Sequence, residues 1–144
     1  MDIDTIFKIG LDLHGVCDKH RVLFAALTKK WVEAGHEVHI VTGQTWEEAY
    51  DTVKSLDIQY THYFSVVDHH VERGTHVWHT DTGPWMDTNV WDSTKGLYAR
   101  QAGLNIHFDD TIRYAQHFPR SCSFVWVGKD FTDVYHEVLM TMLP

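Results

Sequence analysis

The sequence predicts a single α/β domain built on a five-stranded, mostly parallel sheet. Short apolar runs alternate along the chain with segments of helical period, a pattern typical of parallel strands joined by crossover helices. No repeat, low-complexity tract or Pro/Gly-rich linker divides the 144 residues, and this length suits one domain spanning residues 1–144. A content of 44% hydrophobic and 22% charged residues is ordinary for a globular protein.

We expect three strands and two helices in the first half of the chain. Each strand is a short apolar run that ends at a polar residue or a glycine, where the chain turns. The first helix stops at Gly35, and the second opens with a capping sequence at Thr45 and closes at Asp57. The strands are Phe7–Asp12, Glu37–Thr42 and Tyr60–Phe64, and the first helix has its apolar stripe on Leu23, Phe24, Leu27 and Trp31.

Residues 65–88 interrupt this alternation. They combine several His, Asp, Gly and Pro residues with no clean period, so we expect a small insertion, such as a hairpin, over one end of the sheet. The regular pattern then resumes with a helix that stops at Gly103. The elements expected from there are a helix over Asn89–Ala102, a strand over Leu104–Asp109, a short helix over Ile112–His117, a strand over Ser123–Val127 and a helix over Thr132–Leu143.

Charge and composition narrow the classes of partner. The net charge of −8 argues against binding to a nucleic-acid polymer, which requires a basic face. No apolar run is long enough for a membrane span, and the first residues lack the basic start of a signal peptide. Two cysteines, Cys17 and Cys122, make no disulfide framework, so we expect a cytoplasmic protein with reduced thiols. The oligomeric state stays open.

Polar side chains follow the predicted strands where these strands end. The carboxyl ends of parallel strands meet at one crevice, so these side chains should lie close together. Two acids, a lysine and a hydroxyl in one crevice suit phosphoryl transfer to an aspartate, with carboxylates holding Mg²⁺ and the lysine neutralising phosphate oxygens. The residues are Asp12 and His14 after the first strand, Thr42 at the end of the second, Lys95 on the helix before the fourth, and Asp109 and Asp110 at the end of the fourth.

The order of these motifs resembles that of the haloacid dehalogenase (HAD) superfamily of phosphohydrolases. The motifs are Asp12-Leu13-His14-Gly15-Val16, an apolar strand ending in Thr42, then Lys95, and an apolar strand ending in Asp109-Asp110. The resemblance covers nearly the whole chain, from Phe7 to Val127. It implies a three-layer Rossmann-like fold with the sheet order 5-4-1-2-3, in which residues 65–88 form a minimal cap.

The resemblance also implies the reaction and the metal. Asp12 would be the nucleophile that forms an aspartyl-phosphate. His14 would give its backbone carbonyl to Mg²⁺ and would act as the acid and base through its side chain. Asp110 would complete the metal site with Asp12. The implied enzyme is a phosphatase that hydrolyses a small phosphate monoester, and a nucleotide is the first substrate to test.

Three further residues would bind the transferring phosphate in such a site, and one would position a neighbour. Thr42, Gly43 and Lys95 are the phosphate-binding residues that the resemblance implies. Asp109 would orient Lys95. No partner other than a small phosphorylated substrate is expected.

The histidine at position 14 keeps a second hypothesis open, because most HAD phosphatases have aspartate there. A histidine can protonate a leaving alkoxide and then activate water, so hydrolysis is the main prediction. The alternative is a catalytically degenerate HAD-like domain that binds a phosphorylated ligand or a protein partner. A receiver domain of a signalling system fits less well, since its paired acids precede the acceptor aspartate.

Histidines elsewhere have simpler expected roles. The insertion contains imidazoles and carboxylates that suit Zn²⁺, but their spacing matches no closed structural site. We therefore expect a lid or substrate-contacting flap there, with Arg73 as its cation. His39 and His107 alternate with apolar neighbours inside strands, and we expect them to be packed or hydrogen-bonded. The insertion residues in question are Asp68, His69, His70, His76, His79 and Asp81.

Overall fold

The computed structural model describes residues 5–142 as an α/β structure with one five-stranded sheet, and every strand pair in that sheet is parallel. The order is β3-β2-β1-β6-β7. Its labels differ from the expected 5-4-1-2-3 because the insertion contributes β4 and β5, which pair with each other outside this sheet. The strands of the sheet are β1 (Lys8–Leu11), β2 (Glu37–Thr42), β3 (His62–Ser65), β6 (Ile106–Asp109) and β7 (Ser123–Trp126).

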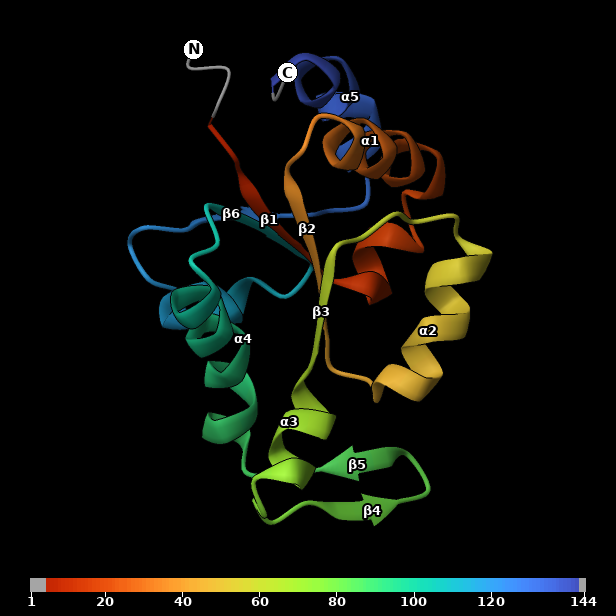
Figure 1. The fold of residues 1–144 in the computed structure, drawn as a ribbon. Helices are drawn as coiled ribbons and strands as arrows, with labels where there is room; N and C mark the ends of the chain where they lie inside the picture. Colours follow the sequence, from red (N-terminus) through yellow and green to blue (C-terminus); the bar gives the residue numbers. More distant parts are fainter. Residues whose placement is uncertain (1–4, 143–144) are drawn as a thin grey trace.

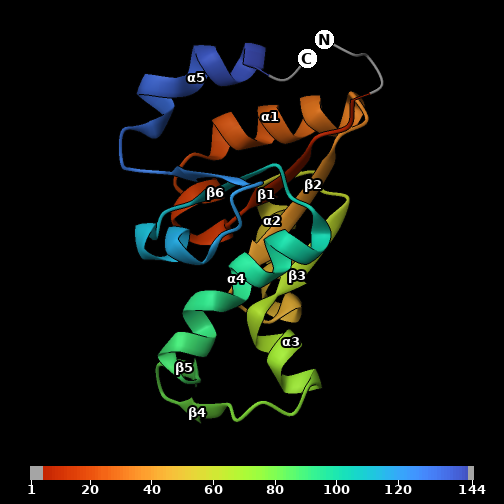
Figure 2. The same cartoon turned by 90° about the vertical axis from the view of Figure 1, so that its left-hand side faces the viewer.

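Helices cover both faces of the sheet (Figures 1 and 2). One face is covered by α1 (Arg21–Glu33), α2 (Trp46–Ser55) and α5 (Phe131–Met142), and the other by α4 (Thr88–Ala102) and the short helical turn η2 (Ile112–His117). The expected end of the last helix, Leu143, lies outside the described residues. Within residues 5–142, no helix has both the length and the apolar composition that crossing a membrane requires.

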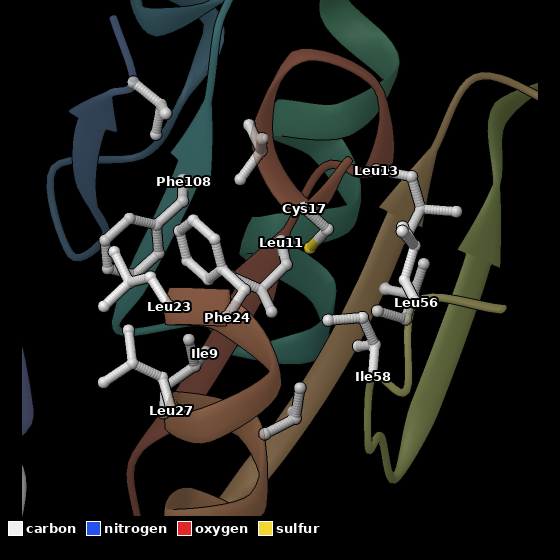
Figure 3. Packing of buried hydrophobic residues seen from close by; sticks show 14 of the residues in the cluster. Ile9, Leu11, Leu13, Cys17, Leu23, Phe24, Leu27, Leu56, Ile58 and Phe108 are labelled. Atoms are coloured by element: carbon white, nitrogen blue, oxygen red, sulfur yellow. The ribbon is translucent and has the colours of Figure 1, made fainter. Parts of the chain in front are cut away.

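The main core lies between the sheet and α1, α2 and α5. Figure 3 shows Ile9 and Leu11 of β1 and Phe108 of β6 against side chains of α1, including Phe24 and Leu27. All five are fully buried. Burying such a side chain contributes about 1.5–3 kcal/mol. A smaller core on the other face packs α4 against β2, so the sheet edge that carries the polar residues is held from both sides.

The insertion forms a helix and a hairpin rather than a hairpin alone. The helix, α3 (Val66–Glu72), begins at Ser65, whose hydroxyl oxygen accepts a hydrogen bond from the Asp68 amide at 3.0 Å. The hairpin consists of β4 (Trp78–Thr80) and β5 (Gly83–Trp85). With seven residues, α3 is too short to show a helical period in the sequence. These elements lie together at the bottom of Figure 1, and we call residues 66–87 the cap.

Candidate active site

A cavity of about 760 Å³ lies where the cap meets the carboxyl ends of the strands. Its size is within the range of small-molecule sites, roughly 300–1,000 Å³. Residues lining it come from β-strand ends, from α4 and from the cap, and they include the aromatic side chains of Trp85, Trp91 and Tyr114. Five residues singled out from the sequence also line it, namely Asp12, His14, Gly43, Lys95 and Asp110. Thr42 and Asp109 are fully buried and do not line it.

Lys95 is the centre of the polar contacts. Its Nζ lies 2.8 Å from Asp109 Oδ2 and 3.2 Å from Asp12 Oδ1, and only 5% of the lysine is exposed. Although burial acts in the opposite direction, the charges of Asp12 and Asp109 raise the pKa of Lys95 above its ordinary value. Lys95 is therefore a fixed cation that joins the ends of β1 and β6.

Besides Lys95, Asp109 has two further partners. Its Oδ2 lies 3.0 Å from His107 Nε2, and its Oδ1 accepts a hydrogen bond from the Thr111 amide at 3.0 Å. Burial alone would raise the pKa of Asp109, but the hydrogen bond from His107 and the charge of Lys95 hold it well below its usual range. This carboxylate is consequently ionised and occupied, which suits an orienting role.

Asp12 has too little positive charge around it. Burial raises its pKa to about 8, Lys95 offsets part of this effect, and the charge of Asp109 adds to it. Oxygens of Asp12, Asp109 and Asp110 lie within 4.8 Å of one another. Three carboxyl groups therefore lie together, and the lysine pairs with only two of them, so the charge imbalance favours binding of a cation.

Gly15 brings the end of β1 against the end of β6. Its φ is +80°, a value that L side chains rarely adopt, and a Cβ there would collide with the Asp110 carboxylate. The turn therefore requires glycine twice over, for its backbone angle and for the close approach. The structure thus explains why the Asp12–Val16 motif contains glycine at position 15, which the sequence alone does not explain.

His14 lines the cavity and has a carboxylate partner. Its Nδ1 lies 3.3 Å from Asp18 Oδ2, and the other Asp18 oxygen accepts a hydrogen bond from the Gly15 amide at 2.7 Å. Asp18 thus links the imidazole to the turn that carries it. If Nδ1 donates to Asp18, then Nε2 is left to exchange protons with a ligand.

The end of β2 contributes in a different way from the one expected. The hydroxyl oxygen of Thr42 accepts a hydrogen bond from the Gln44 amide at 3.2 Å, and the side chain stays within the packed edge of the sheet. Gly43 gives room to Trp91, because a Cβ there would come within 2.8 Å of the indole ring. Trp91 donates from Nε1 to the Tyr114 hydroxyl at 2.8 Å. These contacts fix one aromatic wall of the cavity.

Several residues at the cavity gave no recognisable signal in the sequence. Arg113 lines the cavity and pairs with Asp92 at 3.3 Å, whereas Arg73, the cation expected for the flap, does not line it. Gln44 also lines it, and its buried side-chain oxygen has no hydrogen-bond partner among the described residues. Asp92 lies one helical turn before Lys95, on the same side of α4, and this spacing is the only feature of the sequence that places Asp92 near the cavity.

One histidine of the insertion holds the cap in place. His70 lies 2.7 Å from Thr94 Oγ1 and 3.0 Å from Thr75 Oγ1, so it ties the cap to α4. Among residues 5–142, neither group of side chains close enough to share an ion includes a histidine of the insertion. His79 lines the cavity, in keeping with a flap that contacts a ligand.

Comparison of the chain with models of protein families, with curated proteins and with solved structures finds no match.

Proposed function

We propose that this chain is a magnesium-dependent phosphatase with a three-layer HAD-like fold, which hydrolyses a small phosphate monoester through an aspartyl-phosphate. The observation that carries the proposal is the buried Lys95 between Asp12 and Asp109, with Asp110 beside them and a cavity above. A buried lysine with two carboxylates at the carboxyl edge of a parallel sheet is well placed to receive a phosphate group.

The donor atoms suit Mg²⁺. Carboxylate and carbonyl oxygens are the ligands that this ion prefers, and the cluster of Asp12, Asp109 and Asp110 offers oxygens alone. Asp12, Asp110 and the backbone carbonyl of His14 would hold the ion, since Asp109 is already occupied by Lys95 and His107. Bound there, Mg²⁺ would favour the ionised form of Asp12 and neutralise charge on the phosphate oxygens.

The side chains then divide the reaction between them. Asp12 attacks phosphorus, the bond from phosphorus to the leaving oxygen breaks, and His14 donates a proton to that oxygen. In the second half, His14 accepts a proton from water, whose oxygen attacks the same phosphorus. The Asp12 carboxylate and inorganic phosphate are released. Lys95 carries the positive charge that faces the phosphate throughout.

The cavity wall supports a substrate with a flat or apolar group beyond the phosphate. Trp85 and Trp91 offer aromatic surface, and the unpaired side-chain oxygen of Gln44 can accept a hydrogen bond from the ligand. A nucleotide meets this description.

A second candidate is a catalytically degenerate domain that binds a phosphorylated ligand or a protein partner. The observation in its favour is His14, because the acid common at this position in HAD phosphatases is absent. This hypothesis predicts phosphate binding without turnover.

The proposal predicts hydrolysis of a generic aryl phosphate that depends on magnesium. We expect release of the phenolate in the presence of Mg²⁺ and its loss in EDTA, because Lys95 alone does not balance the three carboxyl groups. Absorbance of the released phenolate measures the rate. Full activity in EDTA would contradict the metal requirement. Absence of turnover on a broad panel of phosphate monoesters, together with binding of inorganic phosphate, would favour the degenerate domain.

The two adjacent aspartates should respond differently to loss of charge. We expect Asp110→Asn to weaken Mg²⁺ binding by about tenfold or more, because it removes a ligand oxygen at little structural cost. Asp109→Asn should instead lower the free energy of unfolding by about 3–5 kcal/mol, because it deprives buried Lys95 of a partner. Calorimetric titration with Mg²⁺ and denaturant unfolding measure the two effects. If Asp109→Asn weakens Mg²⁺ binding more than Asp110→Asn, the assignment of the two residues is wrong.

A further inference from the structure

A second cluster of ionisable side chains lies at the opposite edge of the sheet from the cavity. Glu37 and His62 are the first residues of β2 and β3, and His39 follows on β2 directly beside His62 in the register of the two strands. We call these three residues the amino-edge cluster. All three side chains lie on one face of the sheet, the face that α4 covers.

The ligand atoms of this cluster are close enough to share one ion. Glu37 Oε1 lies 2.8 Å from His39 Nε2 and 3.9 Å from His62 Nδ1, and one ligand atom from each residue falls within a mutual distance of 4.8 Å. Ligand atoms around a tetrahedral Zn²⁺, at bonds of about 2.0 Å, lie roughly 3.3 Å apart. His62 is half exposed, and closing the remaining gap would require its Nδ1 to leave the Thr61 hydroxyl, which lies 2.8 Å away.

The innermost histidine already has the outer partner that metal-binding imidazoles require. Its Nδ1 lies 2.6 Å from the Tyr98 hydroxyl on α4. The ionised Glu37 carboxylate accepts a hydrogen bond from Nε2 of His39 at 2.8 Å. A metal ion bound at Nε2 would take the place of that proton, and the proton on Nδ1 would then be donated to the Tyr98 hydroxyl.

We propose that Glu37, His39 and His62 bind a divalent transition metal ion of the zinc type. Two imidazoles and one carboxylate form a donor set for zinc rather than magnesium, which prefers oxygen alone. The exposed side of His62 leaves a coordination position open to water. The ion would tie the edge strand β3 to β2 and, through Tyr98, to α4. The sequence favoured a hydrogen-bonded role for His39. The structure places Glu37 and His62 beside it, and these are the other two proposed ligands.

Calorimetric titration of the full chain with Zn²⁺, in excess Mg²⁺, tests this site. We expect one zinc ion per chain at the amino-edge cluster and an increase in Tm on zinc addition. His62→Gln should weaken zinc binding by at least about tenfold, and this exposed residue can be replaced without disturbing the core. Tyr98→Phe removes only the hydroxyl that orients His39 and should weaken zinc binding by about 10–100-fold.

The matched control is His136→Gln, which changes an exposed histidine on α5 and should leave zinc affinity unchanged. Repeating the His62→Gln comparison in Asp110→Asn protein reduces the contribution from the carboxylates at the cavity. Nitrogen chemical shifts of the His39 and His62 rings should move on zinc addition. A parent protein that binds no zinc would overturn the proposal. So would a His62→Gln variant with the parent's zinc affinity, or an equal loss in His136→Gln.

Discussion

Replacing Asp12 with asparagine should abolish phosphate hydrolysis while the protein stays folded. The change keeps the shape of the side chain but removes the nucleophilic oxygen, and loss of a nucleophile costs at least about 10⁴-fold in turnover. Stability should change by no more than about 1–2 kcal/mol. The reason is that burial already disfavours the ionised form of the Asp12 carboxyl, whose pKa is raised to about 8, so its charge contributes little to stability. Aryl phosphate hydrolysis and thermal unfolding measure the two effects.

Asp57→Asn is the control for this change. Asp57 is exposed and has a φ of +55°, which asparagine tolerates, so the same chemical substitution should leave both rate and stability unaltered. Hydrolysis by Asp12→Asn at the parent's rate would eliminate the aspartyl-phosphate mechanism.

Replacing His14 with alanine should lower the rate on an alkyl phosphate by about 10²–10⁴-fold, the usual contribution of general acid–base catalysis. An alkoxide needs a proton as it leaves, whereas a stable phenolate does not, so the loss on an aryl phosphate should be smaller. His14→Asp restores the residue common in HAD phosphatases and should keep measurable activity. Rates on the two substrates, measured for both variants, provide the comparison.

This pair of substrates distinguishes a proton-transfer role from a purely backbone role for His14. Equal rates of alkyl phosphate hydrolysis by His14→Ala and the parent would mean that only the carbonyl of residue 14 matters. A parallel loss on both substrates would indicate damage to the turn. Asp18→Asn should reproduce a part of the selective loss, because Asp18 accepts the hydrogen bond at 3.3 Å that holds the imidazole.

Much of the fold could be predicted because it depends on regular patterns. The expected range of β2 matches the observed one, and the range of α4 differs by one residue at its start. Both elements have long or continuous apolar patterns with clear ends. The helix α3 was missed because seven residues with two adjacent histidines show neither period. The hairpin strands have three residues each, too few for alternation to be recognised.

The sequence indicates which polar residues meet at one end of the sheet, and the expected contact between Asp109 and Lys95 is present, but the other contacts could not be predicted. Strand ends placed Asp12 and Asp110 at one edge, as parallel topology requires. The sequence does not reveal that Lys95 is buried between two carboxylates, because a lysine on a helix is normally exposed. The sequence also does not indicate that the Thr42 side chain is buried in the sheet. Nor does it indicate that Arg113, and not Arg73, lines the cavity. Those features depend on side-chain packing between distant segments.

The contact between Gly15 and Asp110 has a consequence for biosynthesis. The strand β1 pairs with β2, made soon afterwards, and with β6, made much later. A growing chain therefore carries Asp12 at an open sheet edge until β6 and the Asp110 that follows it have left the ribosome. The three carboxyl groups converge only then, so the proposed Mg²⁺ would bind late in synthesis, as the sheet is completed around its central strand. A chain arrested before β6 would contain Asp12 without Asp109 and Asp110, which complete the carboxylate cluster.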